Sequence, residues 1–395
     1  MLDTDTPYFL IDEKELAVNI RSFREALRKH WPNSALAYSV KTNSLPWVLE
    51  YLCENGVMAE VVSQEEFDLA RMCGYLPEQI IYNGPIKTGE SFKYALKTGA
   101  IVNIDSEREV TALLSQSLRF RGRLGVRVNI DLTSVCPDDV GYHEDGFRFG
   151  FSYENGELER VLNVIKEYDP TIEVGLHLHV NSITRSVNVY RAIAAFAARI
   201  IREYRLNVGF IDLGGGFFGG VPGKTTPDKY LSVITAELKG VVDTQKVQLL
   251  IEPGSALIGS PVHFVTTVLD VKDTAKGRIV TTDGSRINID PTWRKSGYFK
   301  TIESSGSVYE GRQIVCGYTC MDHDRMMVLE DAPELAVDDK IIYHKVGAYT
   351  MTFGGPFIRY FPDVYVQQHD RIHKVRGRMT VEDYYRIHNF GADHE

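Results

Sequence analysis

The sequence predicts an α/β protein in which a (β/α)8 barrel of the TIM type is followed by a mainly antiparallel β-domain. Two observations support this prediction. Eight short apolar, β-branched runs alternate with helix-like segments before Gly259, and strands separated by turns replace this alternation after Gly259. Eight repeats over roughly 220 residues fit a barrel, which typically needs ~250 residues, better than an open sheet.

Each predicted strand of the barrel ends where an apolar run gives way to polar residues or glycine. The first four ends follow one another at short, nearly equal intervals, as expected for a βα repeat. The predicted strands are 36–40, 57–62, 80–82, 101–104, 124–128, 174–180, 208–213 and 247–251. Helical spacing of apolar residues predicts helices at 64–73, 106–114, 156–168 and 188–204, and a longer loop spans 131–151.

The second part of the chain contains little helical spacing. Its predicted strands are 265–271, 278–282, 312–315 and 340–343. We expect the barrel to span residues 13–258. The β-domain is expected to combine residues 1–12 with 259–395, so that an N-terminal strand joins it.

Composition excludes several classes of protein. Of the 395 residues, 44% are apolar and 25% charged, which is typical of globular domains. The net charge is −9, from 44 Lys and Arg against 53 Asp and Glu, which argues against nucleic acid or an anionic membrane as the main partner. There is no apolar run of ~18 residues to span a membrane, and residues 1–5 lack the features of a signal peptide. We therefore expect a cytoplasmic protein.

The cysteines do not form a recognisable framework. There are five, an odd number, without a CxxC pair. Cys316 and Cys320 are four positions apart, but no nearby Cys and His cluster completes a tetrahedral site. A disulfide framework or a structural zinc site is therefore not expected, and the default interpretation of a cysteine here is a small buried hydrophobe.

Two predicted strand ends carry basic side chains that could do chemistry, because barrel active sites form at the carboxyl ends of strands. Lys41 follows the first strand and could form a Schiff base if its environment lowers its pKa; a solvated surface lysine is the alternative. His177 and His179 alternate on the sixth strand, which suggests zinc ligation. No third carboxylate or thiolate ligand lies nearby in sequence, which weakens that interpretation, and His179 could instead stack on a flat ring.

The last two strands end in turns of distinctive composition. Gly214, Gly215 and Gly216 could close their backbone N–H groups on an anion, or form only a flexible turn. The run differs from the GxGxxG fingerprint of dinucleotide binding. Glu252 precedes a rigid Pro253-Gly254 turn, so its carboxylate could protonate a pyridine nitrogen or serve only as a turn acid.

Taken in order, these motifs resemble the fold-type III decarboxylases that use pyridoxal 5'-phosphate (PLP), the group of diaminopimelate and ornithine decarboxylases, whose barrel is also that of alanine racemases. The resemblance covers essentially the whole chain. The matching stretches are 6–12, 37–43, 60–66, 84–87, 104–106, 179–182, 214–216, 252–254, 316–324 and the Gly-Ala-Tyr motif at 347–349.

The resemblance implies a role for each site residue. Lys41 carries PLP as a Schiff base, Glu252 pairs with the pyridinium nitrogen, and His179 stacks on the ring. Cys320 protonates the α-carbon of the quinonoid intermediate left after carbon dioxide departs. The remaining implied cofactor contacts, chiefly to the phosphate, are Ser182, Gly214, Gly215, Gly216, Gly254 and Tyr349.

The resemblance also implies an assembly. In this family the cysteine and its neighbours, here including Asp324 of the substrate pocket, reach the PLP of the other subunit. The resemblance therefore implies a head-to-tail homodimer with shared active sites. It does not imply a metal ion.

Three departures from the family pattern bear on the substrate. Ser255 stands where an arginine usually ends the turn after strand eight. Asp290 replaces the arginine that grips the distal carboxylate of diaminopimelate, and Met321 replaces an acid directly after the cysteine. A distal carboxylate would lose its arginine fork unless a residue such as Arg286 or Arg294 compensates, and Asp322 could replace the acid. These departures favour a related or bulkier amino acid over simple ornithine.

Two other functions remain open at this stage. Alanine racemases place an arginine at the ring nitrogen, so Glu252 favours decarboxylation over racemisation on the same barrel. A catalytically silent PLP-binding homologue would be expected to lose Lys41 or Cys320, and both are present.

Overall fold

A computed structural model describes residues 4–115, 121–141 and 145–389 of the chain. The chain folds into two compact units, one formed by residues 18–257 and the other by residues 1–17 together with 258–395. The first is the α/β unit and the second is the β-unit. The cofactor-binding role expected for the one and the dimer-forming role expected for the other stay predictions.

The α/β unit is a closed barrel of eight parallel strands. Neighbours follow the order β5-β4-β3-β2-β10-β9-β8-β6, and pairing between β5 and β6 closes the ring. The short strand β7 (Phe151–Ser152) extends the end of β6. The eight strands are β2 (Ser34–Ser39), β3 (Met58–Val61), β4 (Ile80–Tyr82), β5 (Ile101–Ile104), β6 (Arg123–Asn129), β8 (Gly175–His177), β9 (Phe210–Asp212) and β10 (Gln248–Ile251). Each lies within or overlaps a predicted run, so the predicted barrel is confirmed.

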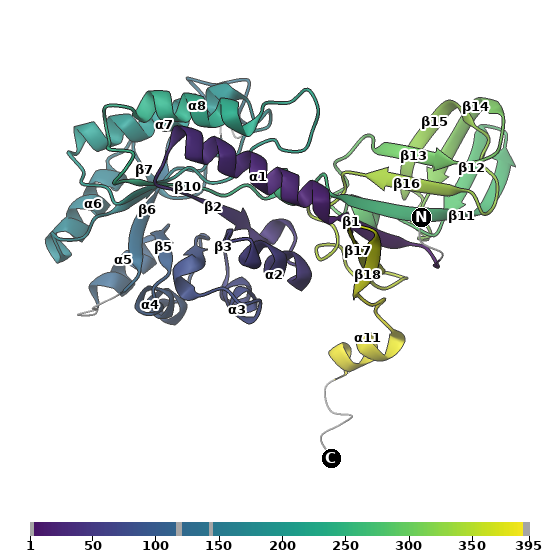
Figure 1. Ribbon diagram of the computed structural model, residues 1–395, viewed down its shortest axis with the longest axis horizontal. Helices are drawn as coiled ribbons and strands as arrows, with labels where there is room; N and C mark the ends of the chain where they lie inside the picture. Colours follow the sequence, from purple (N-terminus) through teal and green to yellow (C-terminus); the bar gives the residue numbers. More distant parts are fainter. Residues whose placement is uncertain (1–3, 116–120, 142–144, 390–395) are drawn as a thin grey trace, which may run out of the picture. The chain divides into compact units, whose positions relative to one another are not determined.

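Helices surround the strands of this unit (Figure 1). Several begin at the residues that favour helix starts: Ser63 and Thr226 each accept a hydrogen bond from a backbone N–H of the first turn, and Pro227 occupies the first turn of α8. The helices are α1 (Glu13–His30), α2 (Pro46–Glu54), α3 (Gln64–Met72), α4 (Gly89–Thr98), α5 (Glu107–Leu114), α6 (Glu157–Tyr168), α7 (Val187–Glu203) and α8 (Pro227–Leu238).

The interior of the barrel has an apolar layer that supports the polar strand ends. Ala37, Ile81, Ile101, Phe210 and Leu250, from five different strands, form one buried cluster. Two glycines on neighbouring strands make room for the Phe210 ring, since a Cβ at position 175 would lie 2.1 Å from that ring and one at position 125 would lie 2.7 Å from it. Bulky side chains therefore fill the barrel interior at this apolar layer, as in other barrels of this type.

The β-unit is a mainly antiparallel sheet that includes the N-terminal strand, as predicted. Its strands follow the order β15-β14-β12-β11-β1-β17-β18, with β16 pairing to both β11 and β13. Among the described strand pairs of this unit, β12 with β14 and β1 with β17 are the parallel ones. The strands are β1 (Tyr8–Asp12), β11 (Val262–Thr274), β12 (Gly277–Thr282), β13 (Phe299–Glu303), β14 (Val308–Cys316), β15 (Arg325–Pro333), β16 (Lys340–His344), β17 (Asp363–Gln368) and β18 (Arg371–Arg376).

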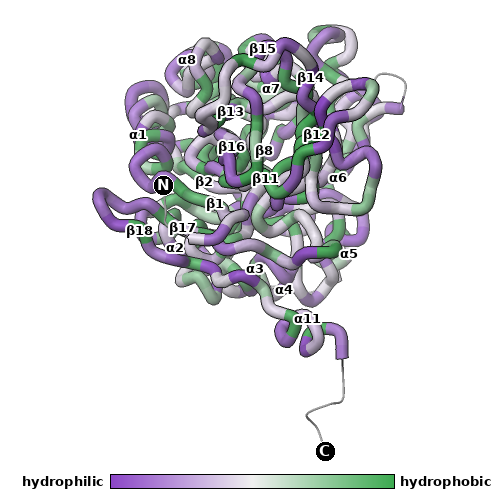
Figure 2. The backbone as a smooth tube through the Cα atoms, turned by 90° about the vertical axis from the view of Figure 1, so that its right-hand side faces the viewer, coloured by the Kyte–Doolittle hydropathy of each residue, from purple (hydrophilic) through white to green (hydrophobic). Residues whose placement is uncertain are grey.

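Sequence analysis missed several elements of the β-unit: β13, β15, β17, β18 and the helices α10 (Arg286–Ile289) and α11 (Val381–His388). The missed strands β13 and β18 are largely exposed, and hydrophilic and hydrophobic colours alternate along β18 in Figure 2. Strands with water on one face carry charged residues, so they lack the continuous apolar run that identifies a buried strand.

Candidate active site

Lys41 lies in a short 3-10 turn, η1 (Val40–Thr42), directly after β2. Its Nζ is 2.8 Å from Oε2 of the buried Glu60, the acid near the end of the next strand. Ser39 Oγ donates to the same oxygen at 2.5 Å. Burial would raise the pKa of Glu60, but the charge of Lys41 and these hydrogen bonds outweigh it and lower that pKa. The lysine is therefore held by an ionised carboxylate at the end of the first strand.

Glu252 directly follows β10 and is 4% exposed. The turn after it packs closely on the lysine turn, since a Cβ at Gly254 would lie 2.0 Å from Thr42 Oγ1. Burial, followed by repulsion from Asp212 and Glu60, raises the pKa of Glu252 well above its ordinary value. Burial also raises the pKa of Asp212 to about 6. The Glu252 carboxyl group could therefore accept a hydrogen bond from a protonated ring nitrogen placed here, or transfer its own proton to that nitrogen.

Two histidines stand beside this carboxyl pair with parallel rings, 6.4 Å apart at an angle of 10°. Only His177 belongs to β8; the strand ends there, so the prediction that both histidines share a strand is wrong, and His179 lies in the segment that follows. Burial, followed by the charge of Arg127, lowers the pKa of His179 to about 3. A neutral imidazole is suited to stacking on a flat aromatic ring.

Sequence analysis found no carboxylate near the two histidines to complete a metal site, but the structure brings two carboxyl groups from other strands close to His177. His177, Asp212 and Glu252 each present one ligand atom, and these atoms all lie within 4.8 Å of one another. His177 Nε2 is 4.0 Å from Glu252 Oε2, and neither nitrogen of His177 has a hydrogen-bond partner among the residues that the structure describes. His179 is not part of this group. A small cation or a ring nitrogen would both suit these side chains.

The glycine run after β9 forms a tight loop against His179. Gly214 and Gly216 have φ of 63° and 85°, in the left-handed region that favours glycine. A Cβ at Gly214 would lie 2.5 Å from His179 Nδ1, and one at Gly215 would lie 2.5 Å from the carbonyl oxygen of Glu252. Tyr190 fixes the loop by donating to the carbonyl of Gly215 at 2.9 Å. Backbone this close to the site can approach an anion such as a phosphate.

Ser182, the other predicted phosphate contact of the barrel, lies in the loop after His179. Its Oγ accepts a hydrogen bond from the backbone N–H of Arg185 at 2.8 Å. The hydroxyl hydrogen is therefore left to donate elsewhere. The lysine, the buried acid, the neutral imidazole and the glycine loop together fit the aldehyde, ring nitrogen, ring face and phosphate of PLP.

In the β-unit, the loop that carries Cys320 is organised by Asp324. Cys320 is exposed, whereas Asp324 is 2% exposed. The Asp324 carboxylate accepts from Ser285 Oγ at 2.8 Å, from Thr319 Oγ1 at 2.7 Å and from the N–H of Arg286 at 3.0 Å. Asp324 therefore ties the cysteine loop to the start of α10, and its oxygens are already engaged.

The other predicted substrate residues divide into buried and exposed groups. Asp290 is 2% exposed and accepts from Arg286 Nη2 at 2.5 Å and from Arg286 Nε at 3.2 Å. Asp322 is exposed and pairs with Arg325 at 3.0 Å, and Arg294 is exposed. Asp290 is thus committed to a structural ion pair, while Asp322 and Arg294 present charge to solvent.

Tyr349 of the Gly-Ala-Tyr motif is partly exposed and has a φ of 56°. A bulky residue in the left-handed region is uncommon, and such strain is concentrated at functional sites.

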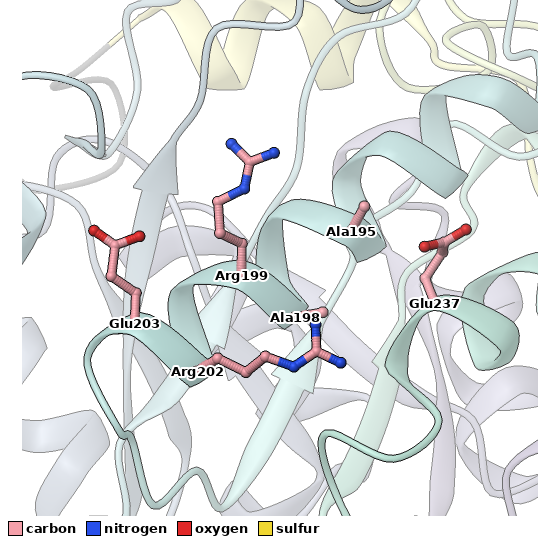
Figure 3. Close-up of a pocket in the computed structure, with 6 residues that line it drawn as sticks. All are labelled: Ala195, Ala198, Arg199, Arg202, Glu203 and Glu237. Atoms are coloured by element: carbon pink, nitrogen blue, oxygen red, sulfur yellow. The ribbon is translucent and has the colours of Figure 1, made fainter.

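One cavity of the barrel unit lies away from the strand ends, between two of its helices. A pocket of about 500 Å³ lies on α7 and α8 and is lined by Ala195, Ala198, Arg199, Arg202, Glu203 and Glu237 (Figure 3). None of its lining residues belongs to a strand end, so we base the candidate site on the chemistry of the barrel mouth.

Sequence analysis assigned no role to four polar side chains of the barrel interior: Glu60, Asn83, Asn103 and Asp212. All four are at most 3% exposed. The available signal was a polar residue within or directly after an otherwise apolar strand, where a parallel strand is expected to be apolar on both faces.

The barrel, the β-unit and the residues at the strand ends together indicate the class of barrel enzymes that use PLP. Residues 16–259 match the family described as pyridoxal-dependent decarboxylase, pyridoxal binding domain, and the chain belongs to this family. It is a PLP-dependent amino-acid decarboxylase, and thus a carboxy-lyase. The described helices are all too short or too polar to cross a bilayer.

Curated relatives and solved structures agree with this assignment. A probable chloroplastic diaminopimelate decarboxylase of Oryza sativa subsp. japonica is 28% identical over 396 residues, covering 96% of this chain and 79% of the relative. The diaminopimelate decarboxylase of Helicobacter pylori (strain ATCC 700392 / 26695) is 26% identical and covers 98% and 96%.

A crystal structure of the Helicobacter pylori enzyme complexed with L-lysine has a TM-score of 0.83 at 24% identity, covering 98% of this chain and 97% of that one. The arginine decarboxylase of Paramecium bursaria Chlorella virus has a TM-score of 0.77 at 21% identity, covering 92% and 96%. These similarities confirm the fold.

Proposed function

We propose that the enzyme removes the α-carboxyl group of an amino acid other than ornithine, using PLP held by the residues at the barrel mouth. The observation that carries this proposal is the buried Glu252 beside Asp212, on a barrel whose first strand is followed directly by the turn of Lys41. When bound, PLP supplies an electron sink for the electrons of the broken bond. Lys41 holds its aldehyde carbon, Glu252 its ring nitrogen and His179 its ring face.

The protein residues set the protonation states that this reaction needs. Glu60 orients Lys41 through the contact of 2.8 Å between Oε2 and Nζ. His179 stays neutral at physiological pH because burial lowers its pKa, so its ring packs without adding charge. Glu252 keeps a proton at the ring nitrogen. Ser182, Gly215 and Gly216 bind the phosphate through hydroxyl and backbone N–H groups. Gly214, whose N–H donates to Asp212, and Gly254 let the loops after β9 and β10 approach the cofactor, and Tyr349 is the proposed phosphate contact from the β-unit.

The proposed proton donor to the α-carbon is Cys320, contributed by the partner subunit of a homodimer. Its exposure in the single chain and the family resemblance support this role. Asp324 positions the cysteine loop, and Asp322 is the acid nearest in sequence to that thiol.

A mixing experiment tests the shared site. Lys41→Ala and Cys320→Ala would each be inactive alone as homodimers. In an equal mixture, half of the dimers are mixed and each regains one intact site, so activity should return to about a quarter of wild type. Mixtures that stay inactive although exchange is demonstrated with a tagged chain would exclude a shared site, as would a monomer in sedimentation.

The structure supports a substrate whose distal end differs from that of diaminopimelate, the substrate named for the relatives. Arg286 is the nearest replacement for the missing arginine fork, but its guanidinium is paired with Asp290 and also donates to the carbonyl of Lys295 at 2.8 Å. Arg294 and Asp322 remain as exposed candidates for recognising a distal carboxylate or amine. We therefore propose a related or bulkier amino acid as the substrate.

Carbon dioxide release from a panel of amino acids tests the reaction and the substrate together. The panel contains diaminopimelate, lysine, ornithine, arginine and conjugates of acidic amino acids. Lys41→Ala should abolish the visible absorbance of covalently bound cofactor, whereas Lys246→Ala, at an exposed lysine, should not. Wild-type protein that binds no PLP would refute the proposal. Solvent deuterium exchange at the α-carbon without carbon dioxide release would favour a racemase.

The proposal includes a cytoplasmic location. All five cysteines are free thiols, which suits a reducing compartment. Cell fractionation would test it, and recovery of the protein outside the cytoplasm would contradict it.

A further inference from the structure

Asn83, directly after β4, bridges two buried carboxyl groups. Its Nδ2 is 3.2 Å from Glu60 Oε1 and 2.8 Å from Glu252 Oε1. The side chain is 3% exposed, and the amide has two N–H groups, so it can donate to both carboxyls at once. One amide therefore connects the acid that holds Lys41 with the acid at the end of the last strand.

The orientation of this amide is imposed by Asn103 on β5. Asn103 Nδ2 donates to Asn83 Oδ1 at 2.7 Å and is 3.3 Å from Asp212 Oδ2. If the Asn83 amide were reversed, its oxygen would face both carboxyl groups and its NH2 would face the NH2 of Asn103. The contact with the ionised Glu60 would then pair acceptor with acceptor and the contact with Asn103 donor with donor, so the observed orientation is favoured.

The network continues to the glycine loop. Asp212 Oδ1 accepts from the backbone N–H of Gly214 at 2.9 Å. A chain of hydrogen bonds thus runs from Lys41 through Glu60 and Asn83 to Glu252, with a branch through Asn103 and Asp212 to the loop. It joins the three places where the proposed function puts the aldehyde, the ring nitrogen and the phosphate of the cofactor.

We propose that Asn83 is a positioning residue that holds the Glu60 and Glu252 carboxyl groups in the arrangement required by the cofactor, and that Asn103 acts through it by fixing its amide. This inference rests on the proposed function, because it assumes PLP at the barrel mouth. The hydrogen bond from Asn83 to Glu60 is charge-assisted, because Glu60 is paired with Lys41, and such bonds are strong in buried surroundings. Losing it together with the bond to Glu252 should therefore weaken cofactor binding. An ionised aspartate here would donate to neither carboxyl group and would place a negative charge beside the ionised Glu60.

The test measures the dissociation constant of PLP from the apoprotein and the visible circular dichroism of the bound cofactor, which reports the orientation of its ring. Asn83→Leu and Asn83→Asp should each weaken PLP binding about 10- to 100-fold, the loss expected for one hydrogen bond to a charged group, here the Glu60 carboxylate paired with Lys41. Both should change the circular dichroism. Asn103→Leu should do the same to a smaller extent, and adding it to Asn83→Leu should weaken binding further by no more than about threefold.

The matched control is Asn19→Leu. Asn19 is a buried asparagine of α1, 4% exposed, whose amide donates to the carbonyl of Leu257 at 2.9 Å. This variant should lower the melting temperature of the apoprotein but leave the PLP dissociation constant within about twofold of wild type. The comparison separates positioning from loss of a buried amide in general.

The outcomes are distinct. If wild type binds PLP and folded Asn83→Leu or Asn83→Asp binds it equally well with unchanged circular dichroism, the role of Asn83 is refuted and the proposed function stands. If wild type itself does not bind PLP, the proposed function fails. The size-matched Asn83→Asp variant decides the question if Asn83→Leu does not fold.

Discussion

Replacing Gly214 by alanine isolates what the glycine loop contributes to the barrel. The new Cβ would lie 2.5 Å from Nδ1 and 2.6 Å from Cβ of His179. The residue would also keep a φ of 63°, which disfavours alanine by ~1–2 kcal/mol. Forcing His179 or the loop to move adds a cost of ~1–3 kcal/mol. The expected loss in the free energy of unfolding is therefore ~2–5 kcal/mol.

Gly156→Ala is the matched control for this change. Gly156 has a φ of 85° at the start of α6, but a Cβ there would meet nothing within 4 Å. It should lose only the backbone contribution, ~1–2 kcal/mol. The difference between the two variants measures the overlap with His179.

Urea denaturation followed by tryptophan fluorescence is a suitable assay, because Trp31 and Trp47, two of the three tryptophans, lie in the barrel unit. Gly214→Ala should also bind PLP more weakly, since His179 and the loop both move, while Gly156→Ala should bind it normally. Equal losses of stability in the two variants, or unchanged PLP binding in Gly214→Ala, would refute the reasoning.

Two further predictions concern buried charge. Lys87 is 1% exposed and its Nζ is 3.1 Å from both oxygens of Glu109. Lys87→Met should therefore lower the free energy of unfolding by ~3–5 kcal/mol, because it leaves a buried carboxylate unpaired, and the further change Glu109→Leu should recover much of that loss. A loss below ~1 kcal/mol in urea denaturation would contradict this. In the β-unit, His263 and His344 are 3.0 Å apart between their Nδ1 atoms, and burial lowers the pKa of each. Folding favours the neutral forms of both histidines, so their contribution to the free energy of unfolding should be fully present above pH 6.5, the pKa of an unfolded histidine, and should decrease as the pH falls below it. His263→Asn should reduce this pH dependence in melting curves from about pH 5 to 8.

Much of the barrel could be predicted from the sequence because its parallel strands are buried on both faces. Runs such as 101–104 and 247–251 are continuously apolar or nearly so, and short turn and helix segments separate them. The same logic led to Lys41, the glycine run and Glu252, since the carboxyl ends of all barrel strands meet at one mouth. Strands exposed on one face, such as β13 and β18, lack this signal.

Spatial neighbours that are far apart in sequence could not be predicted. Asn83 and Glu252 are 169 positions apart, and Asn103 and Asp212 are 109 apart, yet each pair is joined by a hydrogen bond. Asp290 was predicted as a substrate contact on its position in a motif alone. Its ion pair with Arg286 depends on the turn of α10 that places the two side chains on one face.

By itself the sequence determined the barrel, the β-domain that follows it and the strand ends at which the chemistry is placed, because apolar periodicity and turn residues act over a few neighbouring positions. Only the tertiary structure decided which polar side chains share the barrel interior, that Asn83 bridges two acids, and that Arg286 is already paired. Closing the barrel brings distant strand ends together in a buried interior, and there the orientation of one amide depends on all of its neighbours.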